Sequence, residues 1–477
     1  MSAPVRLPPP RKTRIIATVG PSSESFERLR ELAEAGVNVF RLNFSHAKHD
    51  WARGVVTRIR ELEQHLGRPI AILMDTQGPS IRTGELPVPL TLVKGGIFTF
   101  TVGAEKPDDG PGVGVNYDKL DDDLSVGDTV LVDNGVIRMK VLEKKRDRIR
   151  CEVLTPGIMG SRRHINLPGV KVSLPSITEK DFVDVRWGAE NGLDFVALSF
   201  VRTRADIEQL REFLTSLRSP MRILAKIEDQ EAVRNFDEIL HAADAVMVAR
   251  GDLGVELPFE ELPILQRRIV RSCLRFNKPV IVATQMLESM IENPMPTRAE
   301  VTDVANAAYE QADAVMLSGE TSVGRHPVKC VEALDAITRR MEREEGASFT
   351  SEAVFTNDRQ RLVASAIMLA NELKAVGVVV FTHAGNMPRM ASWLRPQSSH
   401  IYAFTPNETI WRQMCLLWGV RAFQMDLKDE DPEVSVQSAI KVLKKENLVQ
   451  PGDTLVFLTQ VRMHNQAHDS VQPRKVT

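Results

Sequence analysis

The sequence predicts an α/β protein: a (β/α)8 TIM barrel with an inserted β-barrel lid domain and a C-terminal α/β domain with a mostly parallel sheet. Three observations lead to this fold class. Short apolar runs alternate with amphipathic segments, and eight such β-α units can be counted on the two sides of one interruption. The interruption is β-rich, with no convincing helix. A second, separate alternation of strands and helices follows the eighth unit.

Composition places the chain among ordinary globular proteins. With 477 residues it exceeds the size of one core, so about two to four domains are expected. The formal charge of −2 argues against a nucleic-acid surface. Its four cysteines form no CxxC pair, which favours reduced thiols over disulfides or zinc. No apolar stretch approaches the roughly 18 residues of a membrane span. We therefore expect a cytoplasmic protein with no membrane partner.

The first three β-α units follow a short N-terminal tail, residues 1–12, which has no signal-like apolar core. Their predicted strands are 13–20, 37–44 and 70–74, and the predicted helices are 24–35 and 48–66. Ser22 and Ser23 are expected to cap the first helix. Successive units of this kind predict a parallel sheet with right-handed crossovers. We assign residues 13–78 and 175–345 to the barrel domain.

The interruption, residues 79–174, is expected to form a separate β-domain. It is joined to the barrel through Gly78-Pro79 and Leu174-Pro175. Asp133-Asn134-Gly135 is a strong signal for a two-residue hairpin turn. An insertion at the carboxyl ends of barrel strands lies over the active site, so this domain is expected to act as a lid.

The remaining units resume after the insertion. Predicted helices are 179–191, one from residue 204, 231–240, 260–276 and 297–310, and predicted strands are 194–200, 221–228, 245–256, 279–283 and 313–317. Beyond residue 345, a C-terminal domain (346–477) is predicted with strands at 376–381, 400–404, 421–424 and 454–458. This last domain lacks a Gly-rich fingerprint and a carboxylate pair, so regulation or assembly is the expected role.

Two apolar runs that end abruptly in charge carry the predicted chemistry. The first ends in Lys226 and Glu228, and the second ends in Arg250, Gly251 and Asp252. Residues two apart on a strand share a face, so Lys226 and Glu228 should point the same way. An amine beside two carboxylates suits a divalent metal with a cationic partner, as in phosphoryl or enolate chemistry.

Charged and polar residues at the ends of several predicted strands, these two included, converge on one predicted mouth. The set is Arg41, Asn43, Ser45, Asp75, Thr76, Lys226, Glu228, Asp252, Thr284, Ser318 and Glu320. Taken alone, Lys226 and Glu228 could form a structural ion pair. Structural ion pairs have no reason to gather at the carboxyl ends of several strands, so we favour an active site.

Several stretches in this order resemble the pyruvate kinase family over nearly the whole chain. They are Arg41-Leu42-Asn43-Phe44-Ser45-His46, Ala225-Lys226-Ile227-Glu228, Val246 to Glu256, Ala283 to Met290, Asn293 to Glu300 and Met316 to Thr321. The resemblance implies phosphoryl transfer from phosphoenolpyruvate to ADP, followed by protonation of the enolate to pyruvate. It also implies a homotetramer and leaves room for a phosphorylated allosteric effector.

The resemblance further implies a role for each matching residue. Glu228 and Asp252 would hold Mg2+ (or Mn2+), and Lys226 would stabilise the moving phosphoryl group and the enolate oxygen. Substrate would be anchored by Arg41, Lys226, Thr284 and the backbone near Gly251 and Asp252. The nucleotide would meet Asn43, His46, Arg82 and Arg163. The family's K+ ligands match Asn43, Ser45, Asp75 and Thr76, and the proton relay would run near Thr284, Ser318 and Glu320.

Four departures from the family pattern bear on potassium use and on regulation. Gln77 and Ser80 replace residues that are charged in many members. At the position of Ser80, a Glu accompanies potassium dependence in the family and a Lys accompanies independence. Because the K+ ligands are retained, we favour use of K+. The loop Thr382 to Pro388 has few hydroxyls and Val461 replaces a glycine, so a sugar-bisphosphate site there is doubtful.

Two other functions would use a similar barrel mouth. A metal-dependent barrel lyase acting on pyruvate or phosphoenolpyruvate would use a similar carboxylate pair, but it needs no nucleotide lid. A non-catalytic metabolite sensor would keep the pocket, but it has no need of Lys226 together with the proton-relay groups.

Overall fold

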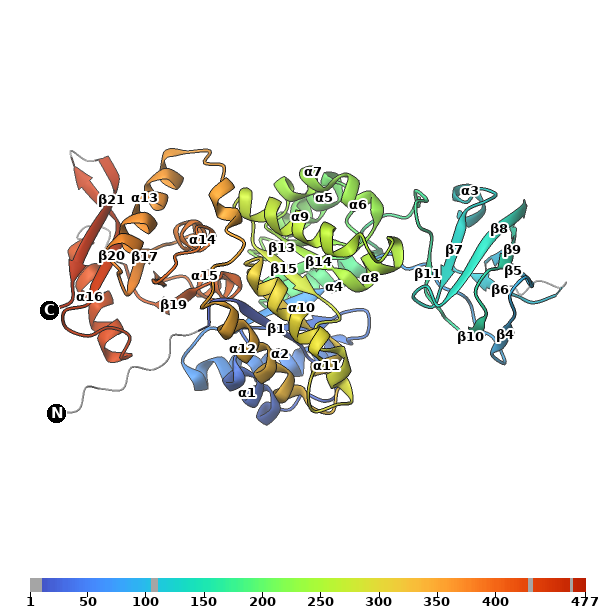
Figure 1. The fold of residues 1–477 in the computed structure, drawn as a ribbon, viewed down its shortest axis with the longest axis horizontal. Coiled ribbons are helices and arrows are strands. Elements are labelled where there is room, and N and C mark those ends of the chain that lie inside the picture. The colour runs from blue at the N-terminus through green and yellow to red at the C-terminus, as the bar shows by residue number, and fades with distance from the viewer. Residues whose placement is uncertain (1–10, 104–109, 428–431, 464–465) are drawn as a thin grey trace.

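The computed structural model describes residues 11–103, 110–427, 432–463 and 466–477, without the side chains of 460–467. Most of the predicted N-terminal tail therefore lies outside the described residues, as does the side chain of Val461. Figure 1 shows three parts in a row, with the barrel in the middle, the inserted β-domain at one end and the C-terminal domain at the other.

Eight parallel strands close into a barrel in the order β1-β16-β15-β14-β13-β12-β3-β2, which confirms the predicted fold class. The strands are β1 (Arg14–Thr18), β2 (Val39–Asn43), β3 (Ala71–Asp75), β12 (Phe195–Leu198), β13 (Arg222–Ile227), β14 (Ala245–Ala249), β15 (Val280–Ala283) and β16 (Ala314–Leu317). Almost every strand residue is buried, because one face fills the barrel interior and the other packs under the helices. This double burial explains why the strands appear in the sequence as continuous apolar runs.

The helices around the barrel begin close to the predicted positions. They are α1 (Phe26–Ala35), α2 (His49–Leu66), α4 (Glu179–Glu190), α5 (Arg204–Ser216), α9 (Leu262–Arg275) and α10 (Arg298–Tyr309). A further barrel helix, α12 (Pro327–Met341), was not predicted from the sequence. The predicted capping of α1 by Ser22 and Ser23 is wrong, because the Ser25 side chain accepts from the Arg28 backbone N–H. Thr178 and Thr297 each close a capping box at the start of α4 and α10.

Two predicted elements are divided differently in the structure. The run 245–256 is not one strand: β14 ends at Ala249, and α8 (Arg250–Glu256) follows at once. Arg250, the first residue of α8, donates from its guanidinium to the Ala283 and Thr284 carbonyls and pairs with Asp303 at 2.6 Å. The predicted helix 231–240 is broken at Asn235 into α6 (Gln230–Arg234) and α7 (Phe236–Ala242).

The inserted domain is a six-stranded sheet, in the order β11-β7-β8-β9-β5-β6, with a two-stranded sheet β10-β4. Its elements are β4 (Leu90–Leu92), β5 (Ile97–Val102), β6 (Gly112–Val115), α3 (Leu120–Asp123), β7 (Thr129–Val132), β8 (Ile137–Lys145), β9 (Arg148–Val153), β10 (Gly157–Met159) and β11 (Ile165–Asn166). Backbone bridges from Arg82 to His164 and from Thr83 to Val115 link the two edges of the larger sheet, so it curls toward a barrel. The expected two-residue turn is wrong: Val132 pairs with Ile137, which leaves four residues between the strands.

The C-terminal domain has a five-stranded sheet, β19-β18-β17-β20-β21, that is parallel except for its last strand. Its elements are η2 (Phe349–Glu352), α13 (Asp358–Glu372), β17 (Gly377–Phe381), α14 (Asn386–Trp393), β18 (His400–Thr405), α15 (Glu408–Gln413), η3 (Met414–Leu416), β19 (Val420–Gln424), α16 (Pro432–Lys445), β20 (Thr454–Met463) and β21 (Gln466–Lys475). The sequence did not reveal β21, because it is a polar edge strand that contains Pro473. Ion pairs from Arg412 to Glu63 and from Arg395 to Asp313, at 2.7 and 2.9 Å, tie this domain to the barrel.

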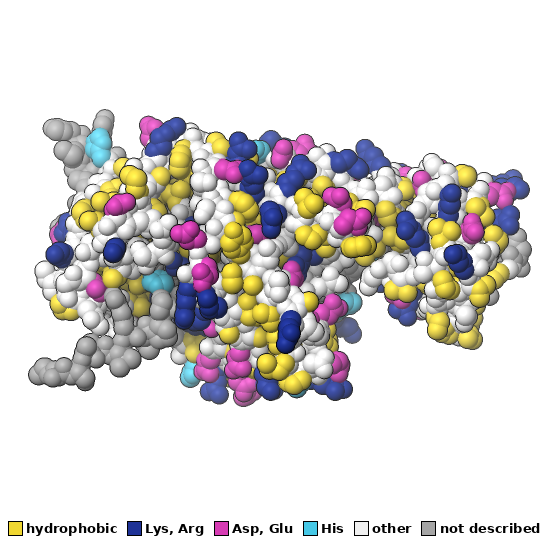
Figure 2. Space-filling model, in the orientation of Figure 1, with side chains coloured by type: hydrophobic (Ala, Val, Ile, Leu, Met, Phe, Trp, Pro, Cys, Tyr) yellow, Lys and Arg dark blue, Asp and Glu magenta, His cyan; other side chains and the backbone are white. Residues whose placement is uncertain are grey.

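Within the described residues no helix is long and apolar enough to cross a bilayer. Figure 2 shows basic and acidic side chains interspersed over the visible face, with neither sign dominating it. This distribution matches the small net charge of the sequence.

Candidate active site

A cavity of about 410 Å3 opens where the carboxyl ends of the barrel strands meet the inserted domain. The barrel contributes Arg41, Asn43, Ser45, His46, Asp75, Thr76, Gln77, Ser199, Phe200, Lys226, Glu228 and Asp252 to its lining. The connection and the inserted domain contribute Ser80, Arg82, Asp133, Asn134, Arg162, Arg163 and His164. Residues separated by more than 200 positions in sequence therefore share one site, at the end of the barrel where chemistry is expected.

Lys226 lies at the centre of a buried hydrogen-bond network on the barrel side of this cavity. Its Nζ is 2.7 Å from Glu228 Oε1 and 3.0 Å from Asp75 Oδ1, and it donates to Ser199 Oγ at 2.8 Å. The predicted common orientation of Lys226 and Glu228 is thus confirmed. The other Glu228 oxygen accepts from the Phe200 backbone N–H at 2.7 Å. Three partners hold the amine in one position, which is the preorganisation that electrostatic catalysis requires.

Arg41 forms a second cationic contact with the same carboxylate. Its Nε donates to Asp75 Oδ2 at 2.7 Å, and its Nη1 donates to Thr18 Oγ1 at 3.0 Å. Asp75 therefore lies between two cations, with each oxygen bound to one of them. Burial alone would raise the pKa of Asp75, but the charges of Arg41 and Lys226 outweigh it and lower the pKa. Asp75 is ionised, and it fixes both cations at the mouth.

The pKa values of Lys226 and Glu228 are both raised, but for different reasons. Burial alone would lower the pKa of Lys226, but Asp75, Glu228 and Asp252 together raise it, so the amine stays protonated. Burial raises the pKa of Glu228, the charge of Asp252 adds to this effect, and Lys226 opposes it. The carboxylates of Glu228 and Asp252 together carry more negative charge than the single positive charge of Lys226 neutralises.

Asp252 is positioned by the first turn of α8 rather than by a strand. Its side chain is half-buried, lines the cavity and forms no hydrogen bond or ion pair within the described part of the chain. In the same range no three His, Cys, Asp or Glu side chains cluster closely enough to hold a metal by themselves. Mg2+ commonly binds one or two carboxylates and completes its shell with substrate phosphates and water. Glu228 and Asp252 fit this donor set.

The four residues expected to bind K+ all line the same cavity, and each has at least one side-chain oxygen atom. The Asn43 side-chain oxygen accepts from the Ser45 backbone N–H at 3.1 Å. Thr76 Oγ1 accepts from the Ser199 backbone N–H at 3.0 Å, and the Thr76 carbonyl accepts from Ser199 Oγ at 2.7 Å. Oxygen donors of this kind suit hard cations.

Comparison with known proteins now decides the family. The family description "Pyruvate kinase, barrel domain" matches residues 10–331, and "Pyruvate kinase, alpha/beta domain" matches residues 360–471. Plastidial pyruvate kinase 2 of Arabidopsis thaliana is 42% identical over 98% of this chain and 81% of its own length. The pyruvate kinase of Geobacillus stearothermophilus is 42% identical over 94% of this chain and 78% of its own.

The chain belongs to the pyruvate kinase family.

A solved structure of a pyruvate kinase from Cryptosporidium parvum supports this assignment. It superposes with a TM-score of 0.93 at 34% identity and covers 98% of this chain and 96% of the other. Both family descriptions, the curated relatives and this structure thus agree on a pyruvate kinase fold.

The predicted nucleotide residues of this pyruvate kinase lie on both sides of the cavity. Asn43 is the last residue of β2 and His46 follows that strand, whereas Arg82 and Arg163 belong to the inserted segment. Arg82 Nε donates to Ser80 Oγ at 3.2 Å, and Arg163 Nη1 pairs with Asp133 Oδ1 at 3.2 Å. These two cations face the mouth from the insertion, as a phosphate-binding lid would require.

Four predicted residues are not among those that line the cavity: Gly251, Thr284, Ser318 and Glu320. The Gly251 N–H donates to Thr284 Oγ1 at 2.7 Å, and Thr284 has a φ of 68°, which is rare for a β-branched residue and typical of a functional site. Ser318 Oγ is buried and has no hydrogen-bond partner in the described residues. Glu320 is buried and accepts from the backbone N–H groups of Ser318 and Leu287 at 2.7 and 3.1 Å.

Sequence reasoning missed several residues that the structure brings into the site. Ser199 contacts Lys226, Asp75 and Thr76, yet a serine after an apolar strand gives little signal by itself. Its place at the carboxyl end of β12 could have indicated it, since the matching positions of neighbouring strands were chosen on that basis. His164 and Arg162 were missed because pairing within the inserted domain, and not strand periodicity, brings them to the cavity.

Proposed function

We propose that this chain catalyses the pyruvate kinase reaction at the cavity described above. The bond between phosphorus and the enol oxygen of phosphoenolpyruvate breaks, and a bond forms between that phosphorus and a terminal oxygen of ADP. The enolate left behind takes a proton at its methylene carbon and becomes pyruvate. The observation that carries the proposal is the fixed Lys226 amine, held by Glu228, Asp75 and Ser199 within the cavity wall.

Lys226 and Arg41 neutralise negative charge in the proposed mechanism. Phosphoryl transfer depends on positioning and charge neutralisation and needs no covalent nucleophile. Lys226 would contact the moving phosphoryl group and then the enolate oxygen, where charge develops. Arg41, bound to Asp75 and Thr18, would contact substrate phosphate from the neighbouring strand. The Asp252 N–H, in the first turn of α8, would donate to the substrate carboxylate or phosphate, because N–H groups there lack intrahelical partners.

Glu228 and Asp252 are proposed to hold the divalent cation, Mg2+ or Mn2+. When bound there, such an ion would supply positive charge that polarises the phosphoryl oxygens. Asp252 supports this assignment, because its carboxylate has no protein partner in the described residues and faces the cavity. Glu228 directs one oxygen toward Lys226 and is held by the Phe200 amide through the other.

Asn43, Ser45, Asp75 and Thr76 are proposed to hold K+ beside the phosphoryl group. Ser80 brings no charge to this neighbourhood; its hydroxyl accepts from Arg82 Nε at 3.2 Å. A lysine at that position would place an ammonium group near the four oxygen ligands and replace the monovalent cation. With serine there, the positive charge has to come from solution.

The inserted domain is proposed to close over ADP. Arg82 and Arg163 would meet the nucleotide phosphates from the lid, while Asn43 and His46 would meet them from the barrel. Closure would exclude water, which strengthens each charge contact and protects the phosphoryl group from hydrolysis.

The enolate is proposed to receive its proton through water near Thr284 and Ser318. The Ser318 hydroxyl has no hydrogen-bond partner among the residues that the structure describes, which supports this route, since a buried hydroxyl without a protein partner commonly binds water. Glu320, whose oxygens accept two backbone amides, is best understood as a positioning residue for the Ser318 loop.

Assembly as a homotetramer, response to a phosphorylated effector and cytoplasmic location are also proposed. All four cysteines are buried and unpaired, which suits a reducing compartment. Two relatives, from tobacco and Arabidopsis, are named as chloroplastic or plastidial, so fractionation of the source cells is the direct check of compartment. Sedimentation would establish the number of subunits.

A coupled assay with lactate dehydrogenase tests the catalytic proposal. Pyruvate formation should require phosphoenolpyruvate, ADP and Mg2+ together. Pyruvate released without ADP would favour the lyase, and no turnover from well-folded protein under any of these conditions would favour the sensor.

A further inference from the structure

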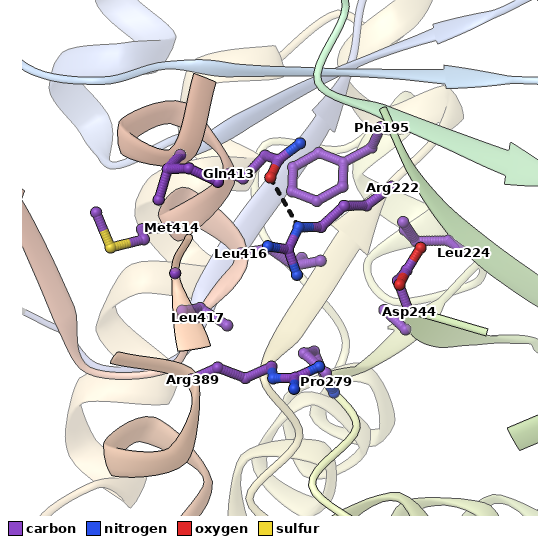
Figure 3. Close-up of a pocket in the computed structure, with 13 residues that line it drawn as sticks. Phe195, Arg222, Leu224, Asp244, Pro279, Arg389, Gln413, Met414, Leu416 and Leu417 are labelled. Atoms are coloured by element: carbon purple, nitrogen blue, oxygen red, sulfur yellow. Dashed lines mark hydrogen bonds between the residues drawn. The ribbon is translucent and has the colours of Figure 1, made fainter. Parts of the chain in front are cut away.

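The two outer domains meet the barrel in different ways. The C-terminal domain is held closely at the amino ends of the strands: in Figure 3, Arg222 Nε donates to Gln413 Oε1 at 2.7 Å, and the cavity between the two walls has a volume of about 20 Å3. The inserted domain is separated from the barrel by a larger cavity, of about 80 Å3, between β11, α6 and α8. A gap of this size leaves few packed side chains, so individual contacts across it decide how the inserted domain lies.

One of these contacts joins Asn166, at the end of β11, to Glu256, at the end of α8. Asn166 Nδ2 donates to Glu256 Oε1 at 3.1 Å, although the two residues are 90 positions apart in the sequence. Asn166 is buried, with 7% of its surface exposed, and its strand pairs with β7. A hydrogen bond to a carboxylate is charge-assisted and stronger than one between neutral groups. It therefore fastens the sheet of the inserted domain to one short helix of the barrel.

The preceding residue of α8, Val255, faces the inserted domain as well. A Cβ atom added to Gly135, in the turn between β7 and β8, would lie 3.5 Å from Val255 Cγ1, so this turn lies against the helix. The neighbouring turn residues, Asp133 and Asn134, line the catalytic cavity. The last two residues of α8 thus meet both the sheet of the inserted domain and a turn that lines the active site.

Asp252 occupies the first turn of the same helix, which has seven residues. Residues four apart share one helical face, so Asp252 and Glu256 lie on the same side of α8, about 6 Å apart along its axis. Since no described residue forms a hydrogen bond or ion pair with the Asp252 side chain, the direction of the helix sets where its carboxylate lies.

The two ends of α8 are held by different parts of the molecule. The barrel fixes its start, where the Gly251 N–H donates to Thr284 Oγ1 at 2.7 Å. At its end, the Glu256 carbonyl accepts from Gln230 Nε2 of α6 at 2.6 Å, and the Glu256 carboxylate accepts from Asn166. The inserted domain therefore contributes to the direction of α8 through the Glu256 side chain.

We propose that Glu256 is a positioning residue for Asp252: its hydrogen bond with Asn166 ties α8 to the inserted domain and keeps the Asp252 carboxylate in place for the divalent cation. A helix of two turns that is fixed at its start acts as a short lever, so a displacement of its last turn moves the residues before it. Because coupling between two sites is reciprocal, a cation bound at Asp252 would in turn hold the inserted domain in this position. This role rests on the proposed function, which assigns the cation to Glu228 and Asp252.

A purely electrostatic role for Glu256 leads to a different expectation. A second carboxylate one turn from Asp252 would attract a cation wherever the inserted domain lies. In that case the charge of Glu256 would matter, and Asn166, which is neutral, would not. Two variants separate these roles. Asn166→Ala removes the contact and keeps the charge, whereas Glu256→Gln removes the charge and keeps a side-chain oxygen that can accept from Asn166.

Titration of the full-length protein with Mn2+ tests the proposal, with the free ion followed by electron paramagnetic resonance and without phosphoenolpyruvate or ADP. The binding component that Asp252→Asn removes is the one that belongs to this site. We expect Asn166→Ala to weaken this component about fivefold or more, because it loses a hydrogen bond to a charged group, and Glu256→Gln to weaken it at most about threefold. Glu260→Ala, which changes an exposed glutamate just beyond α8, is the matched control and should leave the component unchanged.

Hydrogen exchange in the wild type keeps the test decisive if Asn166→Ala fails to fold. Mn2+ should slow the exchange of backbone amides in residues 160–174, which include β11, by about threefold or more. Wild type that binds Mn2+ without slower exchange there, or Asn166→Ala that binds Mn2+ as tightly as wild type, would overturn the positioning role and leave the metal site intact. Mn2+ binding that is unchanged by Asp252→Asn would overturn the metal site, and the positioning role with it.

Discussion

Replacing Lys226 with methionine tests the centre of the proposed site. Methionine keeps an unbranched chain of similar length but loses the amine that contacts Glu228, Asp75 and Ser199. Removal of one preorganised electrostatic contact typically lowers kcat by about 10²–10³. Because Lys226 serves both the phosphoryl group and the enolate oxygen in the proposed mechanism, we expect a loss at the upper end of this range or beyond it.

The structure also predicts how much folding stability Lys226→Met loses. Asp75 keeps its contact with Arg41, whereas Glu228 loses its cation and keeps only the Phe200 amide. Removing one partner of a buried ion pair typically costs about 3–5 kcal/mol, but the cost falls when the remaining carboxyl can take up a proton. Burial already raises the pKa of Glu228, so proton uptake is within reach, and we expect a loss of about 1–3 kcal/mol.

Steady-state kinetics and denaturant unfolding measure the two effects separately. Lys329→Met, an exposed lysine on α12, is the control and should change neither quantity. The KM for ADP should change little in Lys226→Met, because the proposed nucleotide contacts come from Arg82, Arg163, Asn43 and His46. A kcat within about threefold of wild type would remove Lys226 from the mechanism.

Three further predictions follow from the contacts and charges of the site. Ser199→Ala should lower kcat about tenfold with a smaller change in the KM for phosphoenolpyruvate, because the variant removes one of the three partners of Lys226. An unchanged kcat would show that Ser199 is not needed to position Lys226. Glu256→Gln should stabilise the chain by about 1–3 kcal/mol at pH 8 but hardly at pH 4.5. Burial raises the pKa of Glu256 from 4.5 to about 7, so ionisation of this carboxyl lowers the stability of the wild type as the pH rises through that window. Equal gains in stability at both pH values, measured by urea unfolding, would contradict this. Wild type should be several-fold more active in K+ than in Na+ buffer, and Ser80→Lys should reduce the difference; equal rates of wild type in the two buffers would exclude K+ use.

Local sequence patterns predicted the barrel strands and much of the candidate site. Strands buried on both faces must be apolar throughout, so all eight barrel strands could be located from the sequence, and period-two geometry placed Lys226 and Glu228 on one face. Active sites of parallel barrels lie at the carboxyl ends of the strands, and this rule predicted that Arg41, Asp75, Lys226 and Asp252 meet at one mouth. Each of these predictions depends only on residues close together in the chain or on a general property of parallel barrels.

Tertiary structure decided what depends on partners distant in sequence. Asp252 lies on a helix and not on a strand, and Arg250, which begins this helix, donates to carbonyls more than 30 residues away. Ser199 gains its position from contacts with Asp75 and Lys226. A hydrogen bond or its absence is a property of two surfaces, and one stretch of sequence specifies only one of them.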